Sequence, residues 1–155
     1  MSPSITAGLP HPILSPMLAL MGLTAAVWLF MYARRLGYML AHGIDAQRVN
    51  SPQKMAELIP EAVERPANNL RNLFELPVLF YALCLVLMQQ GWALPADGLD
   101  VQLAWAFVGL RALHSLVHCT FNYVNARFAF YALSSIVLWV MLGRVALSVA
   151  QRHSA

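Results

Sequence analysis

Long apolar runs separated by short polar segments limit this chain to very few folds. Four windows, residues 13–40, 67–89, 101–120 and 127–150, approach or exceed the roughly 20 residues that an α-helix needs to cross a bilayer. The chain of 155 residues is 59% hydrophobic and 11% charged, whereas about a quarter of the residues in soluble domains are charged. We therefore predict an all-α integral membrane protein, a four-helix bundle that forms a single domain over residues 1–155.

The remaining composition argues against several other classes of protein. The ten lysines and arginines neither form a run nor alternate with aromatic residues, so they give no sign of a nucleic-acid-binding surface. Cys84 and Cys119 lack the spacing of a zinc site, and we expect both to pack within the spans. No Lys or Arg precedes the first apolar run, unlike in a cleaved signal peptide, so we expect the first helix to remain in the mature protein.

The distribution of basic residues predicts how the spans are oriented. Lys and Arg are enriched in the cytoplasmic connections of membrane proteins. The first and third connections, with their flanks, hold Arg34, Arg35, Arg48, Lys54, Arg65, Arg71 and Arg127. The opposite side holds Arg144 and Arg152. We therefore expect both chain ends outside and residues 41–64 and 121–126 in the cytoplasm, as in a multi-pass protein of a bacterial inner membrane.

Polar residues within the spans gather at the ends that this orientation places on the cytoplasmic side. Residues three, four or seven positions apart share one face of a helix. The second, third and fourth spans each have such a polar stripe, and the first span ends in two arginines: Asn68, Arg71, Asn72 and Glu75; Arg111, His114 and His118; Arg127 and Tyr131; Arg34 and Arg35. A charged side chain in a membrane helix costs at least a few kcal/mol unless it is paired or hydrated. We therefore expect these side chains to face one another across a basic pocket that contains one carboxylate.

Each of these residues also has a simpler interpretation. The arginines that end the first span can extend to the lipid headgroups, and Arg71 and Glu75 can form an ion pair that only joins helices. His114 and His118 have the spacing of two zinc ligands on a helix, but no HExxH motif or carboxylate accompanies them, so we expect no metal site. Tyr131 alone is typical of an aromatic residue at the membrane interface. The hypothesis of a pocket therefore rests on the whole set.

The chemistry of this set indicates a class of ligand. Arginine binds carboxylates through two parallel hydrogen bonds, and the carboxylate of Glu75 suits an ammonium group. Several guanidinium groups, two amides and one carboxylate match a small zwitterion with more anionic groups than amines. A peptide-like molecule with two carboxylates and one amine has this pattern.

Three segments form a recognisable combination: ERPANNLRNLFE in residues 64–75, RALHSLVH in residues 111–118 and RFAFY in residues 127–131. Together they resemble the MAPEG family, the membrane-associated proteins of eicosanoid and glutathione metabolism. The resemblance extends over residues 13–150 and is closest to the microsomal prostaglandin E synthases and to bacterial proteins similar to microsomal glutathione transferases. It implies a homotrimer that binds glutathione between neighbouring subunits, near the cytoplasmic face.

The resemblance also implies roles for individual residues. Contacts to glutathione are implied for a set of residues on all four spans: Arg71, Asn72, Glu75, His114, with Arg111 and Tyr131 beside them, and Arg34, Asn68 and His118. Two of these depart from the family, because Asn68 stands where an arginine is expected and His118 where the family often has a tyrosine, so a guanidinium and an aromatic hydroxyl are missing. Arg127 resembles the catalytic arginine that stabilises the glutathione thiolate. Arg35 resembles a catalytic arginine of the first helix, with Arg34 as the alternative. Phe128 stands where the family often has a serine, so one hydroxyl donor near the sulfur is missing.

The activity implied by the resemblance is that of a glutathione-dependent transferase or peroxidase. Its second substrate would be an apolar small molecule or lipid that enters from the bilayer. The alternative from another class is a non-catalytic lipid-binding or scaffold protein, because the family includes a member without transferase activity. A proton or ion pathway through Glu75 and His114 is disfavoured, because the polar residues stop halfway across the bilayer.

Overall fold

The computed structural model of the chain describes residues 11–89 and 98–153, and these residues are helical with short connections. The elements are α1 (Leu14–Ala41), the 3₁₀ helix η1 (Ala46–Val49), α2 (Pro52–Leu58), α3 (Glu61–Leu73), α4 (Leu76–Met88), α5 (Gly98–Cys119) and α6 (Val124–His153). No strand occurs in the described residues, in agreement with the expected all-α fold. The loop expected between the second and third spans lies largely outside the described residues.

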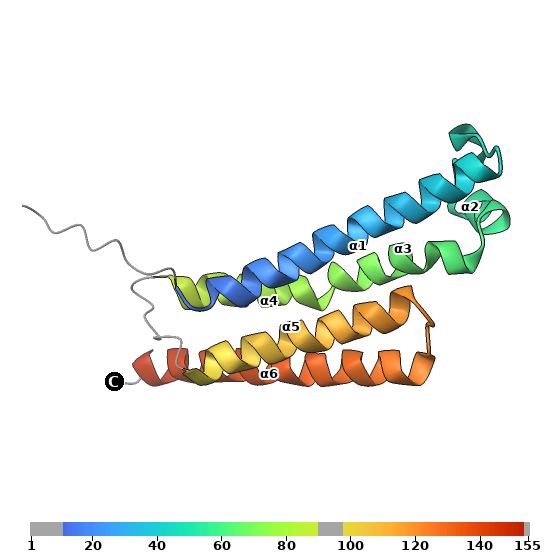
Figure 1. Cartoon of the computed structure of the whole chain (residues 1–155). Coiled ribbons are helices and arrows are strands. Elements are labelled where there is room, and N and C mark those ends of the chain that lie inside the picture. The colour runs from blue at the N-terminus through green and yellow to red at the C-terminus, as the bar shows by residue number, and fades with distance from the viewer. Residues whose placement is uncertain (1–10, 90–97, 154–155) are drawn as a thin grey trace, which may run out of the picture.

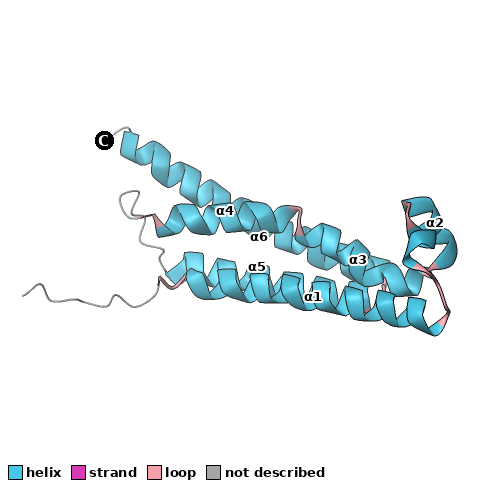
Figure 2. Ribbon diagram, turned by 90° about the horizontal axis from the view of Figure 1, so that it is seen from above, coloured by secondary structure: helices cyan, strands magenta, loops and turns pink. Residues whose placement is uncertain are grey.

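The long helices run lengthwise beside one another (Figures 1 and 2). α1 begins, α4 ends, α5 begins and α6 ends at one end of the molecule (Figure 1). The opposite end collects the end of α1, the short helix α2, the beginning of α3 and the turn between α5 and α6 (Figure 1). The polar ends of the helices therefore lie together at this second end, which is called the turn end below.

Three segments are long and apolar enough to cross a membrane, namely Leu14–Ala41, Glu61–Met88 and Val124–Gln151. They fit an integral membrane protein. α5, which corresponds to the expected span 101–120, is not among these three in the described part of the chain. Its Gln102, Arg111, His114 and His118 lower the mean hydropathy of the helix. A bundle of four membrane spans thus remains a prediction.

The second span differs from its expected form, because it begins at Glu61 and is divided into α3 and α4. Proline has no N–H, and its ring clashes with the carbonyl group four residues earlier, so Pro77 is incompatible with a helix that continues through Leu73. Glu75 precedes α4 with a non-helical ψ of −101°. The break separates Arg71 from Glu75, which an unbroken helix would place on one face.

The polar connection expected over residues 41–66 contains two short helices that the sequence analysis did not predict. The Asp45 side chain accepts a hydrogen bond of 2.7 Å from the backbone N–H of Gln47 at the start of η1. Ser51 caps α2 by accepting a bond of 3.3 Å from the N–H of Lys54. Side-chain caps of this kind satisfy backbone donors that a helix start leaves unpaired. The two short helices close the turn end of the molecule.

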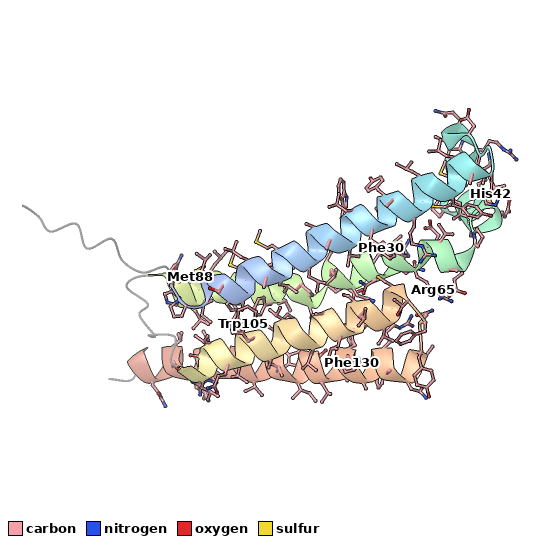
Figure 3. The ribbon with its side chains drawn as sticks, viewed as in Figure 1. Phe30, His42, Arg65, Met88, Trp105 and Phe130 are labelled. Carbon is pink, nitrogen blue, oxygen red and sulfur yellow. The ribbon has the colours of Figure 1, made fainter. Side chains whose placement is uncertain are left out.

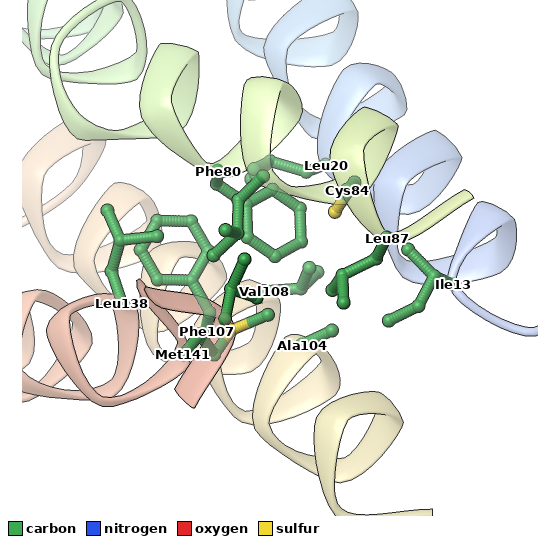
Figure 4. Close-up of a cluster of buried hydrophobic side chains, with 12 residues drawn as sticks. Ile13, Leu20, Phe80, Cys84, Leu87, Ala104, Phe107, Val108, Leu138 and Met141 are labelled. Atoms are coloured by element: carbon green, nitrogen blue, oxygen red, sulfur yellow. The ribbon is translucent and has the colours of Figure 1, made fainter. Parts of the chain in front are cut away.

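The main apolar core lies where α4, α5 and α6 meet the beginning of α1 (Figure 4). Phe80 of α4 and Phe107 of α5 are fully buried and stack with their ring centroids 4.7 Å apart. Cys84 is part of this cluster, and both cysteines are free and buried, in agreement with the expected packing role. Beside this core, Arg144 of α6 donates a hydrogen bond of 2.8 Å to Asp100 of α5. A smaller apolar cluster of Met39, Ile59 and Val63 lies at the turn end.

Candidate functional site

A polar cavity of about 470 Å³ lies between α3, α5 and α6 at the turn end. Figure 3 shows Arg65 at this end of the molecule, and the cavity is lined on that side by residues of α3. Its lining residues are Glu61, Arg65, Asn68, Arg71, Asn72, Glu75, His114, His118, Asn122, Val124, Arg127, Phe128 and Tyr131. Eight residues expected from the sequence are brought together here: Asn68, Arg71, Asn72, Glu75, His114, His118, Arg127 and Tyr131.

Asn72 and two histidines join the three helices around the cavity. The amide nitrogen of Asn72 lies 3.3 Å from Nε2 of His114 and 3.4 Å from Nδ1 of His118. Nδ1 of His114 lies 2.9 Å from the backbone carbonyl of Arg127. Because a carbonyl only accepts hydrogen bonds, Nδ1 carries the proton, and in the neutral ring Nε2 accepts from Asn72. Both nitrogens of His114 are thus engaged within the protein, which fixes its ring.

Arg127 lies one turn inside α6 and is half-buried. Its guanidinium donates a hydrogen bond of 2.5 Å to the side-chain oxygen of Asn122. The amide nitrogen of Asn122 in turn donates a bond of 3.3 Å to the carboxylate of Glu61. The neutral amide of Asn122 thus holds Arg127, for which the family resemblance implied a catalytic role.

Arg111 is fully buried beside the cavity and does not line it. Its guanidinium lies 4.9 Å from the ring centroid of Tyr131 and 5.6 Å from that of Phe107. In the described part of the chain none of its three guanidinium nitrogens has a hydrogen-bond partner. Contact with aromatic faces stabilises a cation by about 0.5–2 kcal/mol, far less than a buried charge requires. Arg111 therefore places a positive charge behind the cavity that no hydrogen bond within the described residues offsets.

Arg71 and Glu75 are exposed at the edge of the polar cavity. No ion pair joins them in the residues that the structure describes, because the helix breaks between their positions. The hydroxyl of Tyr131 donates a bond of 3.4 Å to the carboxylate of Glu75. The two opposite charges are therefore held apart and remain open to a ligand.

Arg35 and Arg34 do not line the polar cavity. Arg35 of α1 forms two hydrogen bonds, of 2.9 and 2.6 Å, with the carboxylate of Glu64 in α3. It faces a second cavity of about 580 Å³, which shares Glu61, Asn68 and Arg71 with the first. The guanidinium of Arg34 lies 5.5 Å from the ring centroid of Phe30. Arg35 is thus separated from Arg127 by the residues that the two cavities share.

Three polar lining residues were not selected from the sequence: Glu61, Arg65 and Asn122. Arg65 donates a hydrogen bond of 2.6 Å to the carbonyl of Thr120, just after α5. Glu61 and Arg65 precede Asn68 by seven and three positions, so they continue the polar face of the same helix. The predicted second span began at residue 67, so Glu61 and Arg65 fell outside the predicted helix. Asn122 has a positive φ of 53°, a conformation in which Asn is enriched.

These features define an integral membrane protein with a polar cavity at one end of its helices, lined by three arginines and two glutamates. The model of the MAPEG family matches residues 13–147, nearly the whole chain. The chain therefore belongs to the MAPEG family, as its motifs indicated. This family includes glutathione-dependent enzymes as well as members without catalytic activity. No curated protein and no solved structure matches the chain.

Proposed function

We propose that this protein is a membrane-bound glutathione-dependent enzyme. It activates the glutathione thiol for attack on lipophilic electrophiles or hydroperoxides, as a transferase or a peroxidase. The observation that carries the proposal is the polar cavity, where Arg127 is fixed by a neutral acceptor while Arg71 and Glu75 keep their charges unpaired within the described residues.

The residues of the cavity fit glutathione. Its volume of about 470 Å³ falls within the range of about 300–1,000 Å³ that is usual for small-molecule sites. Arg65, Arg71 and Arg127 line it together with two carboxylates, and Arg111 adds its charge from behind. This balance suits a tripeptide with two carboxylates and one ammonium group. Arginines can bind the carboxylates in a bidentate manner.

We assign each residue a role that its position in the cavity supports. Arg71 binds a carboxylate of the tripeptide, and Glu75 receives its ammonium group. Asn72 and His114 are neutral contacts, and Tyr131 fixes Glu75 through its hydroxyl. Asn68 and His118 complete the wall of the cavity.

Arg127 acts on the sulfur. Glutathione supplies a thiol nucleophile, and a free thiol with a pKa near 8.5 is mostly protonated at neutral pH. A fixed guanidinium in a partly desolvated site favours the anionic form. Two observations support this role: Arg127 lines the cavity, and its hydrogen bond to Asn122 restricts its side chain.

An apolar groove gives the second substrate a route from the bilayer. The groove has a volume of about 790 Å³ and lies between α1 and α5, where it is lined by Phe30, Leu113 and Leu116 among others. It reaches Thr120, whose carbonyl accepts the hydrogen bond from Arg65 at the polar cavity. An apolar electrophile would therefore approach the glutathione site at the end of the groove next to Thr120.

The assembly and its orientation belong to the same proposal. In a homotrimer of membrane-spanning subunits, Arg35, with Arg34 as the alternative, would approach the glutathione site of a neighbouring subunit. The turn end would face the cytoplasm, in a bacterial inner membrane. A family member without catalysis, which binds lipid in the apolar groove, is the competing function.

Titration of glutathione into the purified, detergent-solubilised protein tests the proposal. We expect saturable binding by calorimetry and a rise in the ultraviolet absorbance of the thiolate with the same midpoint. S-methylglutathione is the control, because it keeps the peptide charges and has no ionisable sulfur. Binding without a thiolate signal would favour the non-catalytic alternative, and the absence of binding would refute the glutathione site.

A further inference from the structure

The turn between α5 and α6 holds the guanidinium of Arg127 through a single residue, Asn122. The backbone N–H of Asn122 donates a hydrogen bond of 2.8 Å to the carbonyl of Val117, which closes the end of α5. Its φ of 53° lies in the left-handed region, where Asn and Asp are more frequent than other residues apart from glycine. The residue that shapes the turn therefore also presents the acceptor to Arg127 at 2.5 Å.

Glu61 of α3 fixes which way the Asn122 amide points. A carboxylate only accepts hydrogen bonds, so the amide nitrogen must face Glu61, at 3.3 Å. The amide oxygen is then left for Arg127. The hydrogen bonds from Arg127 to Asn122 and from Asn122 to Glu61 connect α6, the turn and α3. They limit the rotamers that the long side chain of Arg127 can adopt.

The acceptor on Arg127 differs in charge from those of two other arginines in this chain. Arg35 binds Glu64 at 2.6 Å, and Arg144 binds Asp100 at 2.8 Å. A carboxylate beside Arg127 would fix it equally well, but it would offset the positive charge that the thiolate needs. A neutral amide fixes the guanidinium and leaves its charge in place.

We infer that Asn122 is a positioning residue that holds Arg127 towards the reacting sulfur without neutralising it. The catalytic consequence rests on the proposed function, whereas the holding of Arg127 does not. Glu61 assists by orienting the Asn122 amide.

Two substitutions separate the holding of Arg127 from its charge. Asn122→Gly keeps a residue that accepts positive φ and removes the acceptor. Asn122→Asp also tolerates this backbone and keeps an acceptor for Arg127, but it adds a negative charge and replaces the donor to Glu61 by a second acceptor. The matched controls are Asn125→Gly and Asn125→Asp, because Asn125 is exposed on the first turn of α6 and lines neither of the two cavities.

The first measurement needs no glutathione. The rate at which phenylglyoxal modifies Arg127 is followed by mass spectrometry of the full-length protein in detergent. We expect faster modification in Asn122→Gly than in the wild type and no change in Asn125→Gly. An unchanged rate in Asn122→Gly would overturn the inference, whatever the protein does with glutathione.

The second measurement is the pH profile of kcat/KM with glutathione and chlorodinitrobenzene. In Asn122→Gly we expect kcat/KM to fall about tenfold at neutral pH, as for the loss of a hydrogen bond to a charged group. In Asn122→Asp we expect the midpoint of the profile to rise by about one pH unit, since the carboxylate offsets the guanidinium. The other titratable or charged groups lining the cavity are unchanged in every single-substitution variant: Glu61, Arg65, Arg71, Glu75, His114, His118 and Tyr131.

The outcomes of the two measurements are distinguishable. A wild type that neither binds nor ionises glutathione would refute the proposed function, while the phenylglyoxal rates would still decide whether Asn122 holds Arg127. A profile of Asn122→Asp that matches those of the wild type and Asn125→Asp would refute the role of a neutral acceptor. A melting temperature of Asn122→Gly close to that of the wild type assigns its changes to the site, and Asn122→Asp is compared at matched melting temperature by adding Glu61→Gln, which restores a donor to the new carboxylate.

Discussion

Replacing Arg127 by alanine tests whether glutathione is held and activated by different residues. Two unit charges about 4 Å apart interact by about 4 kcal/mol at an effective dielectric constant of 20. Arg127 is half-buried and lines a cavity that opens to water, so we expect its interaction with the thiolate to be weaker, about 1.4–2.8 kcal/mol. An interaction of this size lowers the pKa of the bound thiol by one to two units. At pH 7, Arg127→Ala should therefore leave glutathione binding nearly unchanged and remove most of the thiolate.

The size of the effect should depend on pH. A thiol with a pKa of about 8.5 is roughly 3% ionised at pH 7, whereas one lowered to about 7 is half ionised. We therefore expect Arg127→Ala to reduce the rate about 15-fold at pH 7 and to approach the wild type near pH 9. In the wild type the thiol stays ionised until the pH falls to its lowered pKa, whereas in Arg127→Ala it is protonated at higher pH. The rate deficit of the variant must therefore grow as the pH falls from about 9 to about 7.

The assay is the pH–rate profile with chlorodinitrobenzene, together with calorimetric titration of glutathione. Arg127→Lys is the matched variant, because a lysine keeps the charge and lacks the planar fork of the guanidinium; it should recover part of the rate. If Arg127→Ala keeps the wild-type profile, Arg127 does not activate the thiol. A large loss of glutathione affinity in the same variant would contradict the separation of holding from activation.

Three further predictions concern binding, the helix break and the orientation in the membrane. Arg71→Ala and Glu75→Gln should each weaken glutathione binding by about 2–3 kcal/mol, as expected for hydrogen bonds to charged groups; unchanged calorimetric affinity in both would make these charges structural only. Pro77→Ala should let α3 continue into α4 and pair Arg71 with Glu75, so glutathione affinity should fall about tenfold; an unchanged affinity would show that the break does not keep these charges apart. Lys54→Cys and Asn125→Cys, with both buried native cysteines replaced by alanine, should react with an impermeant maleimide only in inside-out vesicles; labelling of right-side-out vesicles would reverse the proposed orientation.

Much of the candidate site could be predicted from the sequence, because helical spacing decides which side chains share a face. Asn68 and Asn72 lie on one face of α3, and His114 and His118 lie on one face of α5; all four line the polar cavity. The alternation of spans then places these faces at one end of the molecule. Charged residues in apolar helices are informative because they are costly there unless they are paired or hydrated.

The remaining features depend on tertiary contacts that spacing does not encode. Arg35 lies at the expected end of α1, but its bidentate contact with Glu64 depends on how α1 crosses α3. Asn122 gives little signal in the sequence, because its role arises only when the turn brings it to Glu61 and Arg127. The break at Glu75 could have been predicted, since Pro77 is incompatible with a helix that continues through Leu73. It was not predicted, because the apolar run around Pro77 indicated one continuous span.

The break before α4 sets the depth at which the chemistry would take place. α4 has 13 residues, which is about 20 Å at a rise of 1.5 Å per residue, against a hydrocarbon core about 30 Å thick. With the end of α4 at Met88 placed at the far interface, Glu75 lies roughly 10 Å beneath the near headgroups. A water-soluble tripeptide would thus descend below the membrane surface, and a lipid-soluble substrate would meet it at the level of the acyl chains. Glutathione would then be the substrate that moves between water and the level of the hydrocarbon core, and the lipid-soluble substrate need not leave the bilayer.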